Sequence, residues 1–284
     1  LLSKFPAHLD KVYFVNSGSA ASDLALRLAQ NYTQKQKTIV LDHGYHGNTR
    51  LGIEISPYKY GNKGGNGASR NIIEAALPDS YRGVFREADA GVQYADALIA
   101  QTKDIENIAA FIAEPIVGCG GQVPLATGYL KRLYPYLKEN KILTISDEVQ
   151  TGFGRLGSHF WGFEMHGVNP DIVILGKPIA NGHPMGAVVT TSEIAEAFDN
   201  GMEFFSSFGG NPVSCEIGKA VLQVIEDEAL QKHALTVGNY KKSLLEELKQ
   251  EFYELGDIRG SGLFLGIELI KDDQLTPNTE LAKH

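Results

Sequence analysis

The stretch from residue 142 to residue 155 reads ILTISDEVQTGFGR, and it decides the fold class. Its first part, residues 142–146, is a continuous apolar run of the kind that forms a strand buried on both faces of a parallel sheet. Such runs alternate with amphipathic, helix-like stretches along the chain, which is the pattern of helices laid on a mostly parallel sheet. The sequence therefore predicts an α/β fold.

Two further apolar runs, residues 108–113 and 171–175, end in the same way as the first. The polar residues at the ends of the three runs are Glu114, Asp147 and Lys177. In open parallel sheets, ligands bind outside the carboxyl ends of the strands. Three ionisable groups at such ends therefore predict one shared site.

The N-terminal part of the chain predicts a strand, a turn of small residues and a helix. Val12–Val15 is the expected strand, Asn16–Ser19 the turn, and the helix runs through Asp23–Ala29. Elsewhere we expect strands over Thr38–Asp42 and Ala187–Thr191, and a polar surface loop over Gly61–Asn71.

The C-terminal part predicts a second, smaller domain. A long helical stretch from about Val213 to Glu254 leads to Arg259-Gly260-Ser261-Gly262 and a strand from Leu263 to Leu269. We expect a large α/β domain over residues 1–212. Residues 213–284 are expected to form a linking helix and the start of a small α+β domain that is truncated at its C-terminus.

The composition excludes several function classes. The chain has 284 residues, 43% of them hydrophobic, and a net charge of -8. This predicts a globular protein without a basic field for nucleic acid or anionic membranes, so the expected partner is a small molecule. Cys119 and Cys215 lie far apart, without the spacing of a metal site or a disulfide framework. We expect no metal and, since neither a signal peptide nor a spanning segment is visible, a cytoplasmic location.

Lys177 and Asp147 are the candidate catalytic residues. A lysine directly after a buried strand can lose a proton and form a Schiff base, and a nearby carboxylate can pair with a protonated pyridine nitrogen. Together they point to pyridoxal 5'-phosphate as the cofactor. Taken alone, Lys177 is explained as well by a solvated lysine at a strand end, and Asp147 by a capping aspartate.

Three other features fit this chemistry. The turn Ser17-Gly18-Ser19 offers backbone N–H groups and a positive helix end to a phosphate, although an N-cap serine explains it equally well. Tyr45 can stack on a planar cofactor or be a core aromatic. Arg259, between small residues, can bind a substrate carboxylate with both guanidinium nitrogens or form a surface salt bridge.

Taken together and in order, these segments resemble the class III aminotransferases, pyridoxal-phosphate enzymes of fold type I. The resemblance covers nearly the whole chain. The motifs that carry it are NSGSAASD (residues 16–23), YHG (45–47), AEP (113–115), DEVQTGFGR (147–155), LGKP (175–178), SFGGNP (207–212) and RGSGL (259–263).

The resemblance implies a role for each residue around the cofactor ring. Lys177 would form the internal aldimine and move the proton between the substrate Cα and the cofactor C4'. Asp147 would bind the pyridine nitrogen, and Gln150 the phenolic oxygen. Val149 would pack on one face of the ring and Tyr45 on the other.

The resemblance also implies residues that bind the phosphate and the substrate. The remaining expected cofactor-binding residues are Gly18, Ser19, Ala20, His46 and Glu114. Ser207 stands where the family usually has a threonine that reaches the phosphate of the neighbouring subunit, which implies a homodimer with shared sites. Arg259 matches the carboxylate-binding arginine.

Two positions depart from the family's usual pattern. Relatives often have a glutamate where Ala20 stands. They also often have, where Cys119 stands, a gate glutamate that neutralises the carboxylate-binding arginine. The second departure implies that Arg259 is permanently open to an anion.

Residues 55–60, 78–83 and 182–186 are similar to one branch of the family, which contains ethanolamine-phosphate and phosphohydroxylysine phospho-lyases and alanine–glyoxylate aminotransferase-like proteins.

Our first expectation is an aminotransferase that moves an amino group from an amino acid or amine to a keto acid or aldehyde. The alternative is a phospho-lyase that eliminates phosphate from a phosphorylated amine such as phosphoethanolamine. Its candidate second phosphate site consists of Lys59, Arg70, Arg82 and Arg259. A third reading, a degenerate module without turnover, is disfavoured because both Lys177 and Asp147 are present.

Overall fold

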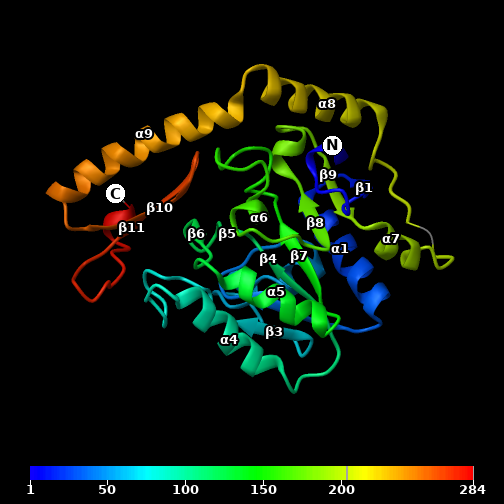
Figure 1. The fold of residues 1–284 in the computed structure, drawn as a ribbon, viewed down its shortest axis with the longest axis horizontal. Helices are drawn as coiled ribbons and strands as arrows, with labels where there is room; N and C mark the ends of the chain where they lie inside the picture. Colours follow the sequence, from blue (N-terminus) through cyan, green and yellow to red (C-terminus); the bar gives the residue numbers. More distant parts are fainter. Residues whose placement is uncertain (203, 284) are drawn as a thin grey trace.

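A seven-stranded sheet carries the larger part of the chain in the computed structural model, which describes residues 1–202 and 204–283 (Figure 1). Its strands are, in spatial order, β1 (Lys11–Val15), β9 (Gly186–Thr190), β8 (Ile172–Leu175), β7 (Leu143–Asp147), β4 (Ile108–Ala113), β2 (Lys37–Leu41) and β3 (Ile72–Ala75). The pairs from β8 to β3 are parallel, and β9 runs antiparallel to both β1 and β8. The predicted α/β class with a mostly parallel sheet is confirmed.

Helices cover both faces of this sheet (Figure 1). The helices are α1 (Gly18–Thr33), α2 (Arg50–Glu54), α3 (Pro57–Tyr60), α4 (Ala90–Thr102), α5 (Tyr129–Glu139), α6 (Gly162–Met165), α7 (Ser192–Phe198), α8 (Pro212–Asp227) and α9 (Leu230–Glu251). Short 3-10 turns are η1 (Leu2–Lys4), η2 (Lys177–Ile179) and η3 (Leu281–Lys283), and two small hairpins pair β5 (Ile116–Val117) with β6 (Val123–Pro124) and β10 (Leu255–Ser261) with β11 (Phe264–Leu269).

Successive side chains of the central strands pack into two different apolar cores, one on each face of the sheet. In β4, Phe111 belongs to the core that contains side chains of α4 and α5, whereas Ile112 belongs to the core that contains side chains of α1. Every residue of β4, β7, β8 and β9 is buried. Burial on both faces explains why these strands have continuous apolar runs instead of alternating ones.

Two details of the C-terminal part differ from the prediction. The single helical stretch expected from about Val213 to Glu254 is two helices, α8 and α9, because the backbone turns at Ala229, which has a φ of 50°. The segment containing Arg259 is strand β10, which the sequence did not predict, since its LGDIRGS sequence has no apolar run.

Close backbone contacts hold the β10–β11 hairpin against the rest of the chain. A Cβ on Gly262, where φ is 54°, would lie 2.5 Å from the carbonyl carbon of Leu156, and one on Gly238 of α9 would lie 2.0 Å from the Gly262 oxygen. The Ser261 hydroxyl donates to the Leu156 carbonyl at 2.7 Å. The hairpin turn is therefore fixed beside the loop that follows β7.

The expected boundary between a large domain and a smaller one, at residues 212 and 213, stays a proposal. It coincides with the start of α8 at Pro212, and α9 with the β10–β11 hairpin forms the arm seen at one side of Figure 1. Glu203 and His284, which fall inside the two ranges, lie outside the described residues. Within residues 1–202 and 204–283, no helix combines the length and apolar character needed to cross a membrane.

We expect Ala229→Gly to stabilise the protein by about 0.5–1 kcal/mol, because glycine adopts a positive φ without the steric cost of a Cβ. The free energy of unfolding from denaturant titration measures this. Ala220→Gly, an exposed alanine inside α8, is the matched control and should destabilise by about 1 kcal/mol. Equal losses in both variants would contradict the left-handed conformation at residue 229.

Candidate active site

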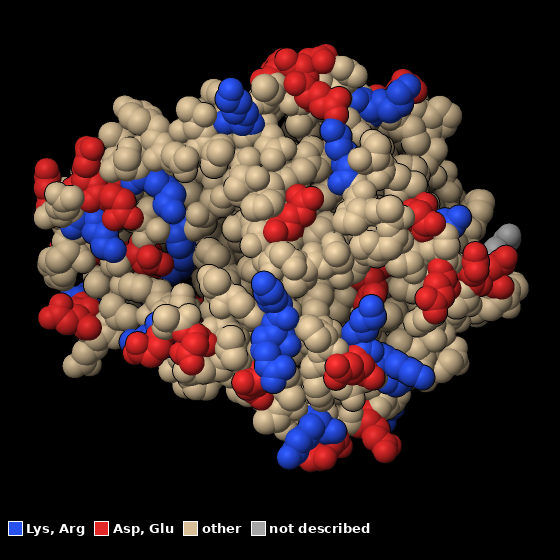
Figure 2. Space-filling model, viewed as in Figure 1, with Lys and Arg blue, Asp and Glu red and all other residues tan. Residues whose placement is uncertain are grey.

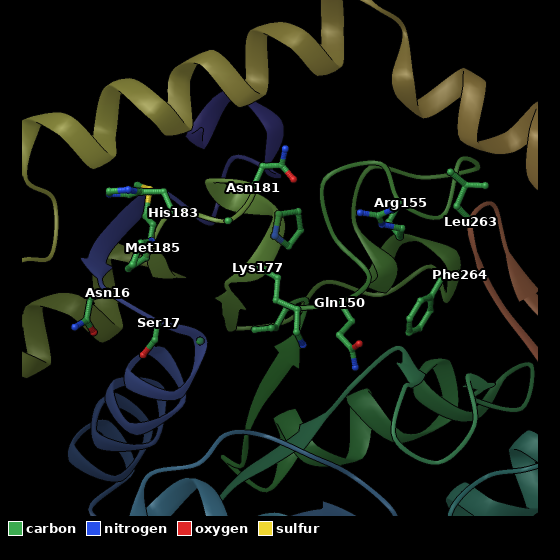
Figure 3. A pocket seen from close by; sticks show the side chains of 15 residues that line it. Asn16, Ser17, Gln150, Arg155, Lys177, Asn181, His183, Met185, Leu263 and Phe264 are labelled. Carbon is green, nitrogen blue, oxygen red and sulfur yellow. The ribbon is translucent and has the colours of Figure 1, made fainter. Parts of the chain in front are cut away.

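Two joined cavities lie at the carboxyl ends of the parallel strands. The inner cavity, of about 160 Å³, is lined by Ser17, Gly18, Ser19, Ser22, Tyr45, His46, Gly47, Glu114, Asp147, Val149, Gln150 and Lys177. The outer cavity, of about 680 Å³, shares Ser17, Gly18, Val149, Gln150 and Lys177 with it. In Figure 3, Lys177 lies at the centre of the outer cavity, between Ser17 on one side and Gln150 and Arg155 on the other.

The strand register brings the three predicted ionisable groups to one edge of the sheet. Ala113 of β4 pairs with Ser146 of β7, and Asp147 pairs with Ile174 of β8. Glu114, Asp147 and Lys177 therefore follow or end adjacent strands, and all three line the inner cavity.

Asp147 is a buried carboxylate held in place from two sides. Its Oδ2 lies 2.8 Å from Nδ1 of His46, and its Oδ1 accepts from the Val149 N–H at 3.1 Å. The His46 N–H in turn donates to the Ser56 hydroxyl at 2.8 Å. Since a carboxylate oxygen can accept more than one hydrogen bond, Asp147 keeps acceptor capacity for a cationic or protonated ring nitrogen in the cavity.

Glu114 fixes two of the groups around the cavity. Its Oε1 accepts from the Tyr45 N–H at 3.1 Å, and its Oε2 accepts from the Gly118 N–H at 3.1 Å and from the Gln150 amide at 3.4 Å. Burial, and then the Asp147 carboxylate, raise the pKa of Glu114 to about 7. The side chain thus aligns the backbone beside Tyr45 and the amide of Gln150.

The first turn of α1 supplies hydrogen-bond donors to the same cavity. The Ser17 hydroxyl caps the helix by accepting from the Ala20 N–H at 3.1 Å. The N–H groups of Gly18 and Ser19 have no acceptor among the described residues, and they sit at the positive end of a 16-residue helix. This is a favourable position for a phosphate.

Glycines let backbone segments meet around this turn. A Cβ on Gly176 would lie 3.1 Å from the Gly18 Cα, and one on Gly47, where φ is 130°, would lie 3.0 Å from the Ser19 Cα. The three segments that follow β1, β2 and β8 can therefore converge on one small volume.

The structure separates three predicted site residues from the inner cavity. Ala20 does not line it, and its N–H is already used by Ser17. Ser207 is exposed and lines neither cavity of its own chain. Arg259 also lies outside both cavities.

The expectation that Arg259 is permanently open to an anion is wrong. Its Nη2 lies 2.6 Å from Oε2 of Glu268 on β11, and its Nε donates to the Gly121 carbonyl at 2.9 Å. Glu268 also forms an ion pair with Arg82. The carboxylate that neutralises Arg259 comes from the neighbouring strand, so the absence of a glutamate at Cys119 does not expose the guanidinium.

Of the other candidates for a second phosphate site, Arg82 meets Arg259 at Glu268, whereas Lys59 and Arg70 share no partner with Arg259. Lys59 is exposed, and its ammonium lies 5.6 Å from the ring centre of Tyr45 and 5.7 Å from that of Tyr58. Arg70 is exposed in the polar segment that follows α3. Neither lines the two cavities.

Sequence reasoning missed Glu148, which organises the loop after β7. Its carboxylate is fully buried and accepts hydrogen bonds from the hydroxyls of Ser146 and Thr151 and from the N–H groups of Gly162 and Phe163, at 2.5 to 3.1 Å. A glutamate next to an expected catalytic aspartate gives no sequence signal that distinguishes it from a surface residue. Ser22 and Gly47 were missed as lining residues, although Ser22 lies in the NSGSAASD motif and Gly47 in YHG, whereas Ser17 belongs to the turn that was predicted to bind a phosphate.

Comparisons with known proteins show the family to which the chain belongs. The family model described as aminotransferase class-III matches residues 1–283. An alanine–glyoxylate aminotransferase 2-like protein of Drosophila melanogaster is 49% identical over 282 residues, which are 96% of this chain and 57% of that protein. The chain spans 57–64% of the length of four curated relatives.

Solved structures share the fold. A phospholyase from Arthrobacter in complex with phosphoethanolamine superposes with a TM-score of 0.90 at 37% identity, covering 99% of this chain and 68% of that one. An amine transaminase from an uncultivated Pseudomonas species, in a pyridoxal-phosphate-bound form, superposes with a TM-score of 0.85 at 30% identity, covering 94% of this chain and 64% of that one.

We expect Glu148→Ala to lower the free energy of unfolding by about 3–5 kcal/mol, because it leaves two buried N–H groups and two hydroxyls without their acceptor. Thermal and denaturant unfolding measure the loss. Glu139→Ala, at an exposed position in α5, is the control and should change stability by less than about 0.5 kcal/mol. A loss below about 1 kcal/mol in Glu148→Ala would argue against the network.

The raised pKa of Glu114 gives stability a defined pH dependence. Between the ordinary value of 4.5 and about 7, the folded chain keeps a proton that the unfolded chain loses, so stability falls as the pH rises through this window. Relative to Glu114→Gln, which does not titrate, we expect the wild type to lose about 1–3 kcal/mol between about pH 5 and pH 8. Unfolding titrations of both proteins across this range provide the measurement, and parallel pH profiles would show that the carboxyl ionises normally.

Proposed function

The chain belongs to the class-III aminotransferase family, and from this premise we propose that it transfers an amino group from an amino acid or amine to a keto acid or aldehyde. The proposed cofactor is pyridoxal 5'-phosphate held covalently by Lys177. The observation that carries the proposal is the inner cavity, where Lys177, the buried pair of Asp147 and His46, and the first turn of α1 face one volume.

The residues present fit this cofactor. The inner cavity has an amine at Lys177, a carboxylate at Asp147 for a ring nitrogen, and unpaired N–H groups at Gly18 and Ser19 for a phosphate. A methyl group at Gly176 or Gly47 would crowd Gly18 or Ser19 in the first turn of α1, which borders this volume. We propose that Val149 and Tyr45 flank the ring, that Gln150 meets the phenolic oxygen, and that Ser207 of the partner subunit reaches the phosphate. The N–H of Ala20 in the same chain would join these contacts by exchanging the Ser17 hydroxyl for the phosphate.

When bound, the cofactor supplies a conjugated system that withdraws electrons from the substrate carbon next to the amine. The chain's own residues then control protons. Asp147, oriented by His46, would keep the ring nitrogen protonated. The amine of Lys177 would accept the proton from the substrate Cα and deliver it again, since it lines both cavities. Glu114 would hold the Gln150 amide in place beside the phenolic oxygen of the cofactor.

Arg259 is our proposed residue for a substrate carboxylate, with one condition. Glu268 occupies its Nη2, so a carboxylate must displace or share this contact before it can bind. Because one carboxylate would replace another beside the guanidinium, the exchange would cost little electrostatic free energy.

A phospho-lyase that eliminates phosphate from a phosphorylated amine is the second candidate function. It is favoured by the likeness to the phospholyase solved with phosphoethanolamine, a protein that is 37% identical to this chain. The same removal of the Cα proton by Lys177 would serve either outcome, so the fold does not choose between them. A degenerate module is not proposed, because Lys177, Asp147 and the α1 turn meet in one cavity.

We also propose a homodimer with shared sites and a cytoplasmic location. Ser207 lies on an exposed segment that includes Phe205 and Phe208, which are 80% and 70% exposed, and such apolar exposure is typical of a protein interface. The two cysteines are unpaired, which is the usual state in a reducing compartment.

The experiment mixes the purified holoprotein with phosphoethanolamine without a keto acid and records released phosphate together with the absorbance of the bound cofactor. We expect no phosphate release, and conversion of the cofactor to its aminated form by alanine or another amino acid, reversed by pyruvate or glyoxylate. Catalytic phosphate release would establish the lyase instead.

We expect Lys177→Ala to lose the absorbance of the covalently held cofactor and to lower turnover by at least about 10³-fold, because both the covalent link and the proton carrier are removed. Circular dichroism confirms that the variant is folded. Retention of the absorbance would show that another residue carries the cofactor.

A further inference from the structure

The ionisable side chains that line the outer cavity are all basic. Its lining residues are Asn16, Ser17, Gly18, Val149, Gln150, Arg155, Lys177, Pro178, Asn181, Gly182, His183, Pro184, Met185, Leu263 and Phe264. They include an arginine, a lysine and a histidine but no carboxylate. The chain as a whole has 34 acidic and 26 basic residues, and Figure 2 shows both signs interspersed over the visible face. The cavity therefore departs from the charge balance of the molecule.

Arg155 is held at the edge of this cavity by its backbone. It follows Phe153 and Gly154, which have φ values of 61° and 75°, and its carbonyl accepts from the Leu263 N–H at 3.1 Å. The turn of the β10–β11 hairpin packs against the same segment. The position of Arg155 is thus set both by the loop after β7 and by the hairpin.

Among the residues that the structure describes, the guanidinium of Arg155 has no carboxylate partner. None of the ion pairs found within residues 1–202 and 204–283 includes it. It lines the outer cavity on the side opposite Ser17, with Lys177 between the two (Figure 3). Arg259, in contrast, is 9% exposed and bound to Glu268, outside the cavity.

We propose that Arg155 binds the anionic group, a phosphate or a carboxylate, at the end of the substrate remote from its amine. This inference rests on the proposed function and narrows its substrate class to primary amines with an anionic tail. Lys177 lines both cavities, so the amine would react at the inner cavity while the tail extends into the outer one. A planar guanidinium suits either anion because it can donate two parallel hydrogen bonds.

The binding site is not the one that the family resemblance assigned to Arg259. It lies in a different element, the loop after β7 instead of strand β10, and it needs no displacement of an internal carboxylate. Both proposed anion sites can be separated experimentally, since Arg155 is exposed and accepts substitution without leaving a buried group unpaired.

The test compares Arg155→Gln and Arg155→Lys with the wild type on three amines: phosphoethanolamine, β-alanine and n-propylamine. The measured quantity is the rate at which each amine changes the absorbance of the bound cofactor in the holoprotein. Arg132→Gln, the same substitution at an α5 residue that lines neither cavity, is the control.

We expect Arg155→Gln to lower the apparent second-order rate constant for the two anionic amines by about 10- to 100-fold. This is the effect of losing hydrogen bonds between charged groups. The rate for n-propylamine should change by less than about twofold, and Arg155→Lys should recover part of the loss. A loss confined to phosphoethanolamine or to β-alanine also supports the site and identifies which anion it takes.

An independent readout avoids the reaction altogether. Propyl phosphate has the anion but no amine, and calorimetric titration should show at least about tenfold weaker binding to Arg155→Gln than to the wild type or Arg132→Gln. If no amine reacts with the wild type, the proposed function fails while this titration still decides the anion site. Equal losses for all three amines, loss of the cofactor from Arg155→Gln, or unchanged rates and unchanged propyl phosphate binding would each overturn the proposal.

Discussion

The parallel pairing of β4, β7 and β8 is the constraint on which the rest of the molecule depends. Because the three strands are buried on both faces and paired in a fixed register, their ends cannot shift relative to one another without moving apolar side chains out of two cores. Three ionisable groups are thereby brought to one edge. The sheet supplies the rigidity that a reaction needs, while the loops supply the chemistry.

Buried carboxylates connect this edge to the loops above it. Glu148 ties the start of the loop after β7 to α6, Glu114 ties the segment after β2 to Gln150, and Asp147 is tied to His46. Each bond joins segments that are far apart in sequence. The polar contacts therefore do more than satisfy buried groups: they set the relative positions of side chains from different loops, and the Glu148 loop also carries Arg155 to the outer cavity.

The sequence was informative where the physical signal is local. Continuous apolar runs identified the buried strands, and the polar residues at their ends identified Glu114, Asp147 and Lys177 as neighbours. Signals that depend on distant segments were not readable. Glu268 neutralises Arg259 from across a hairpin whose first strand has no apolar run, and the turn of that hairpin packs on the backbone of Arg155 through a close contact at Gly262. The break at Ala229 is also invisible, since alanine is a strong helix former.

Lys177 has a φ of 34°, in the left-handed region that a lysine side chain disfavours. Such a conformation costs of order 1–3 kcal/mol, which neighbouring packing must offset. A lineage released from the reaction would gain folding stability by replacing this lysine with glycine or asparagine. Under the proposed function, selection for stability and selection for the reaction would therefore favour different residues at this position.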